Sequence, residues 1–67
     1  MNWTADPVMH YAQSDSGYRI DWCENHHGMF FNAYAPKKGH AKRGKHLDAG
    51  YDLTKLKAQC EAHAAGT

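Results

Sequence analysis

The fold is decided by residues 18–35, which read Tyr18-Arg-Ile-Asp-Trp-Cys23, Glu24-Asn-His-His-Gly28 and Met29-Phe-Phe-Asn-Ala-Tyr-Ala35. The first segment alternates apolar and charged side chains, which is typical of a half-buried antiparallel strand. The second segment is short and ends in glycine, so it predicts a hairpin connection with Gly28 in a left-handed conformation. The third segment predicts the partner strand, which ends because Pro36 cannot donate a ladder hydrogen bond.

Two further elements flank this hairpin. Residues 9–14 predict an earlier strand with weak alternation, followed by a turn at Ser14-Asp-Ser-Gly17. A helix is predicted near residues 53–64, with Asp52 as its N-cap. Its apolar stripe follows helical spacing and consists of Leu53, Leu56, Cys60 and Ala64.

The predicted fold class is α+β. Three strands near residues 9–14, 18–23 and 29–35 form an antiparallel meander, and the C-terminal helix packs on one face. Sixty-seven residues make one small domain, residues 1–67, that buries about 60% of its unfolded surface. Such a domain has no room for a deep catalytic cleft, so we expect a binding module with no catalytic residues and no cofactor.

The segment between the hairpin and the helix is strongly basic. Residues 36–46 hold five of the eight Lys and Arg residues and no acid. Residues 37–50 therefore predict a long basic loop, interrupted at most by a short edge strand near residues 45–48. One interpretation is contact with phosphates or an acidic protein face, and the other is a solvated loop that only aids solubility. The candidate contact residues are Lys37, Lys38, Lys42, Arg43 and Lys45.

The aromatic residues exceed what one face of a small sheet needs. They are Trp3, Tyr11, Tyr18, Trp22, Phe30, Phe31, Tyr34 and Tyr51. Because one helix covers one face, either Phe30 and Tyr34 or Met29 and Phe31 must lie on the open face. That face is either closed by the Trp3 segment or exposed as a patch for a partner or a homodimer. Phe30 and Tyr34 are taken as the candidate partner-binding residues.

Cysteine and histidine recur in two matching pairs, which are Cys23-x-x-His26 and Cys60-x-x-His63. Together they could supply four ligands to a tetrahedral zinc ion. However, Cys60 lies on the apolar stripe of the helix, where a small thiol is a common core residue. We therefore predict no metal, and we keep a zinc-stabilised mini-domain and a disulfide as alternatives.

Charge and hydropathy help to predict the cellular compartment of the protein. The formal net charge is +1, and acids such as Asp15, Asp21 and Glu24 precede the basic segment. No run of 18 apolar residues is present, so no membrane span is predicted. The first residues lack the basic start and apolar centre of a signal peptide. These observations lead us to expect a cytoplasmic protein with reduced thiols.

Residues 17–64 resemble a class of small phage and prophage proteins. The matching segments are Tyr18-Arg-Ile, Asn32-Ala-Tyr34 and Leu56-Lys-Ala-Gln-Cys-Glu-Ala-His63. This class includes inhibitors of bacterial defence such as anti-CRISPR proteins. The resemblance implies a phage-encoded, non-enzymatic inhibitor that binds a host protein or protein–nucleic-acid complex in the host cytosol. The alternative is a small nucleic-acid-binding accessory protein that uses the basic loop.

Overall fold

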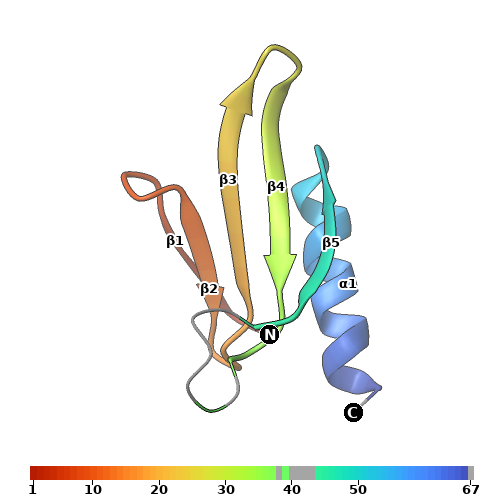
Figure 1. The fold of residues 1–67 in the computed structure, drawn as a ribbon. Coiled ribbons are helices and arrows are strands. Elements are labelled where there is room, and N and C mark those ends of the chain that lie inside the picture. The colour runs from red at the N-terminus through yellow and green to blue at the C-terminus, as the bar shows by residue number, and fades with distance from the viewer. Residues whose placement is uncertain (38, 40–43, 67) are drawn as a thin grey trace.

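The computed structural model describes residues 1–37, 39 and 44–66. An antiparallel sheet of five strands is followed by one C-terminal helix (Figure 1). The elements are β1 (Trp3–Asp6), β2 (Tyr11–Ser14), β3 (Arg19–Asn25), β4 (Gly28–Tyr34), β5 (His46–Gly50) and α1 (Leu53–Ala65). Neighbours in the chain are neighbours in the sheet, so the topology is a simple meander. The predicted α+β class is confirmed, whereas the predicted number of three strands is wrong.

The β3–β4 hairpin forms where the sequence predicts it. Its register pairs Ile20 with Ala33 and closes at the Asn25–Gly28 pair, which leaves two residues in the turn. Gly28 has a φ of +113°, the conformation that glycine adopts without steric cost. Both strands reach further toward the turn than the predicted ranges 18–23 and 29–35, and the hairpin projects beyond the other elements (Figure 1).

The N-terminal strand pair differs from the prediction. The predicted strand 9–14 begins only at Tyr11, because residues 7–10 form a turn. Asp6 Oδ1 holds this turn by accepting hydrogen bonds from the Val8 and Met9 amides, both at 3.1 Å. Strand β1 precedes the turn and pairs antiparallel with β2. Four residues carry too little alternation to predict β1, which is held by this pairing and by Trp3 packing against the core.

Strand β5 occupies part of the predicted loop 37–50. It pairs antiparallel with β4, and a register shift lies between Ala33 and Tyr34. The predicted short edge strand near residues 45–48 is thus present but runs to Gly50. The sequence of β5, His-Leu-Asp-Ala-Gly, has no β-branched residue, so its own propensity is poor. Pairing with β4 and the contact of Leu47 with the core stabilise it instead.

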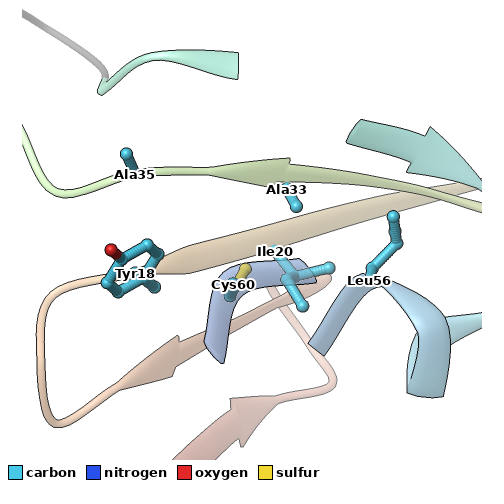
Figure 2. Close-up of a cluster of buried hydrophobic side chains, with 6 residues drawn as sticks. All are labelled: Tyr18, Ile20, Ala33, Ala35, Leu56 and Cys60. Carbon is cyan, nitrogen blue, oxygen red and sulfur yellow. The ribbon is translucent and has the colours of Figure 1, made fainter. Parts of the chain in front are cut away.

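Helix α1 covers one face of the sheet, where it packs against β4 and β5. Asp52 caps it by accepting a hydrogen bond from the Lys55 amide at 3.3 Å, as predicted. Leu56 and Cys60 are fully buried, while Leu53 and Ala64 pack at the border of the core. The core cluster consists of Tyr18, Ile20, Ala33, Ala35, Leu56 and Cys60 (Figure 2). No helix in the described part of the chain combines the length and apolar character needed to cross a bilayer.

Candidate open-face binding site

The open face is the side of the sheet that α1 does not cover. Ile20 and Ala33 are buried beneath the helix, and side chains alternate along a strand. Their neighbours in β3 and β4 therefore point to the opposite side. The open face carries Tyr11, Gln13, Arg19, Asp21, Phe30, Asn32, Tyr34 and His46, and all of these are partly or fully exposed.

Two pairs of aromatic rings lie on this face. The rings of Tyr34 and His46 are 5.3 Å apart, and those of Phe30 and Tyr51 are 5.1 Å apart. Asn32 lies between the pairs on β4, and its Oδ1 accepts a hydrogen bond from His46 Nε2 at 3.2 Å. Strand pairing and these contacts give the rings defined positions, yet Tyr51 remains 50% exposed. The open face is therefore an accessible aromatic surface.

A positioned cation lies beside the rings. The Arg19 guanidinium sits 4.2 Å from the centre of the Tyr11 ring, a cation–π contact. Its Nε also donates to Asp21 Oδ1 at 2.6 Å. The Arg19 side chain is still 48% exposed, so it can reach a ligand on this face.

Four residues, one from each of β2, β3, β4 and β5, lie side by side in a row across the sheet. Gln13 pairs with Arg19, Arg19 with Tyr34, and Tyr34 with His46. We call these four residues the cross-strand row. Each comes from a different strand, so the row combines an amide, a cation and two rings on one side of the sheet.

A hollow of about 230 Å³ adjoins the cross-strand row. Its described lining consists of Gln13, Gly17, Arg19, Asp21, Tyr34, Ala35, Lys37 and Gly44. One aromatic ring, an amide, a carboxylate and two cations therefore surround a single small space. Such a mixture of one aromatic ring and several hydrogen-bonding groups suits a planar polar ligand.

The two ends of the basic segment meet at this hollow. The Ala35 amide donates a hydrogen bond to the Lys45 carbonyl at 2.8 Å. Gly44 lies so close to the chain before it that a Cβ there would be 1.6 Å from the Ala35 carbonyl oxygen. Only a residue without a side chain allows this approach. Gly44 therefore brings the ends of the basic segment together beside the open face.

The predicted site residues divide into three groups. Phe30 and Tyr34 lie on the open face, so this pair and not Met29 with Phe31 is left uncovered. Lys37 lines the hollow, and Lys45 is exposed immediately before β5. Lys38, Lys42 and Arg43 lie outside the described residues.

Sequence reasoning missed the other members of the site. Arg19 was assigned to the correct face by the alternation in residues 18–23 but was not grouped with the aromatic residues. No sequence pattern identified Gln13 and His46 as site residues, because their positions in the row with Tyr34 depend on how the strands pair. The interpretation in which Trp3 closes the open face is wrong: Trp3 packs against the helix-side core, with Lys57 Nζ 5.9 Å from its ring.

The candidate zinc ligands do not come together. Among the described residues, no three His, Cys, Asp or Glu side chains are grouped as a metal site. Cys23 is an exposed free thiol and Cys60 a buried one, so they form no disulfide. His63 Nδ1 shares a hydrogen bond of 2.7 Å with the Tyr18 hydroxyl. Burial raises the pKa of the Cys60 thiol, and the nearby Glu61 charge raises it further, so the thiol stays protonated in the core.

Comparison with known proteins found no family model, no curated protein and no solved structure that matches this chain. The function is therefore inferred from the side chains of the open face and the hollow beside it.

Proposed function

We propose that this chain is a non-enzymatic binding module that contacts nucleic acid, either free or within a protein–nucleic-acid complex. The observation that carries the proposal is the combination of aromatic rings and cations on the open face. Tyr34 and His46 form one ring pair, Arg19 lies beside them, and Lys37 borders the same area. Sequence-tolerant nucleic-acid binding uses this combination, because rings stack on bases while cations contact phosphates.

The electrostatics of the open face support the same conclusion. The net charge is only +1, so attraction to a polyanion must come from local fields and not from the whole chain. The acidic residue Asp21 lies next to the cross-strand row, and its Oδ1 accepts a hydrogen bond from Arg19 Nε. Asp6, at the end of β1, accepts hydrogen bonds from its own turn. The exposed ammonium group of Lys37, which lines the hollow, then gives the edge of this face a positive field.

The test is the affinity for a dye-labelled oligonucleotide of mixed sequence at about 50 and 200 mM salt. We expect binding at the lower salt that weakens steeply at the higher. Changing both Lys37→Gln and Lys45→Gln should weaken binding and lower the slope of log K against log salt by about 1.4–1.8, if both contact phosphates. Both residues are exposed, so stability should change by about 0.5 kcal/mol or less.

Lys55→Gln is a control for the effect of losing a surface charge elsewhere, because it removes one exposed charge from α1, on the other side of the sheet. It should leave the affinity and the salt slope close to those of the wild type. Absence of binding at low salt, or the same slope in the double variant, would contradict the proposal.

A second candidate function is inhibition of a host protein by a phage-encoded module, as the resemblance to small phage proteins implies. The observation that favours it is the β1–β2 turn, where Val8 is 85% and Met9 is 67% exposed. Neighbouring apolar side chains that are exposed on one turn can mark a protein–protein contact. Capture of a host protein that persists after Val8→Ser and Met9→Ser would count against this turn as the contact.

A further inference from the structure

We propose that the hollow beside the cross-strand row accepts one unpaired nucleobase, which makes single-stranded nucleic acid the ligand of the open face. This inference rests on the proposed function and narrows its ligand. Tyr34 lines the hollow and supplies an aromatic ring, the group on which a base would stack. The other lining groups include several suited to the edge of a base and one cation, Lys37, suited to its phosphate.

The groups for the base edge come from β2 and β3. The Gln13 amide offers both donors and an acceptor, and Asp21 offers acceptor oxygens. The Arg19 guanidinium adds donors, because its Nε bond to Asp21 leaves the other N–H groups available on a side chain that is 48% exposed. A planar ligand with donors and acceptors along its rim fits this set. A phosphate alone fits it poorly, because the Asp21 carboxylate lines the same hollow.

The phosphate is expected beside Lys37, which also lines the hollow. Lys37 follows the end of β4 in the chain, whereas Asp21 lies in the other direction along the sheet, where it pairs with Asn32. We therefore expect the charged backbone near Lys37 and the base edge near Gln13 and Asp21. The groups that line the hollow favour no particular base, so the expected sequence preference is modest.

The hollow selects unpaired bases for a physical reason. In a duplex the faces of each base are stacked on neighbouring bases, so Tyr34 cannot reach them. An unpaired base can turn out of its strand and stack on an aromatic ring, which contributes about 1–3 kcal/mol per base and corresponds to roughly 5- to 150-fold in affinity.

The experiment compares three ligands of equal length and label: a single strand with bases, an abasic single strand and a duplex. The abasic strand keeps the phosphates and loses the bases, so it isolates the contribution of stacking. We expect the strand with bases to bind roughly 5- to 150-fold more tightly than the abasic strand, as stacking of one base predicts. It should also bind more tightly than the duplex. Equal affinity for the abasic strand, or for the duplex, would overturn the inference.

These outcomes separate this inference from the proposed function. Salt-sensitive binding of all three ligands with equal affinity refutes the base site but leaves a phosphate-binding module. Absence of binding by every ligand refutes both. The Tyr34→Ala variant should remove the preference for bases, whereas Tyr34→Phe, which keeps the ring, should retain it. The ligand comparison on the wild type decides the question even if Tyr34→Ala fails to fold.

Discussion

Leu56→Ala is expected to lower the free energy of unfolding by about 2–5 kcal/mol. The side chain is 1% exposed and lies among Ile20, Ala33 and Cys60 in the core (Figure 2). Truncation removes apolar contacts and leaves a cavity that a thin core cannot refill. Urea denaturation followed by circular dichroism measures the loss, and thermal melting should show a correspondingly lower Tm.

Lys55→Ala is the control for this change. It alters the preceding residue of the same helix, but Lys55 is exposed and alanine favours a helix as well as lysine does. Its effect should stay within about 0.5 kcal/mol. If the Leu56→Ala protein has the same Tm as the wild type, α1 does not pack on the sheet through this residue.

Gly44→Ala is expected to lower stability by about 1–3 kcal/mol, because the added Cβ cannot be accommodated without a backbone shift. That Cβ would lie 1.6 Å from the Ala35 carbonyl oxygen and 2.9 Å from that of Pro36. Moving the chain here should also break the Ala35–Lys45 hydrogen bond and widen the hollow. We therefore expect oligonucleotide affinity to fall together with stability, as measured by denaturation and fluorescence anisotropy.

Gly50→Ala provides the matched comparison. A Cβ at Gly50 meets no atom within 4 Å, and its φ is not in the left-handed region. The same chemical change should therefore be close to neutral for stability and binding. Equal effects of Gly44→Ala and Gly50→Ala would contradict the close approach of Gly44 to Ala35, where the two ends of the basic segment meet.

The central hairpin and the helix could be predicted because each has a complete local pattern. Alternation from Tyr18 to Cys23 identifies β3, and Asp52 with the stripe from Leu53 to Ala64 identifies α1. Strand β1 has no such pattern, and β5 was predicted only as a short edge strand near residues 45–48. Their residues form strands because neighbouring strands pair with them and because Trp3 and Leu47 contact the core.

The candidate site was predictable only in part, for a similar reason. The chain has more aromatic residues than one helix-covered sheet face can hold. This excess predicted an open face with aromatic residues, for which Phe30 and Tyr34 were the candidates. The neighbours of Tyr34 depend on the register of four strands and on the shift between β4 and β5, so Gln13 and His46 could not be assigned. The contribution of Lys38, Lys42 and Arg43 remains a prediction from the sequence.

The measurement that tests the central claim most directly is a chemical-shift titration of the ¹⁵N-labelled protein with a single-stranded oligonucleotide. It reports which amides sense the ligand, so it locates the binding surface residue by residue. We expect the largest changes in the cross-strand row of Gln13, Arg19, Tyr34 and His46 and at Lys37. Changes confined to α1 or to the β1–β2 turn, or no changes at a saturating concentration, would contradict it.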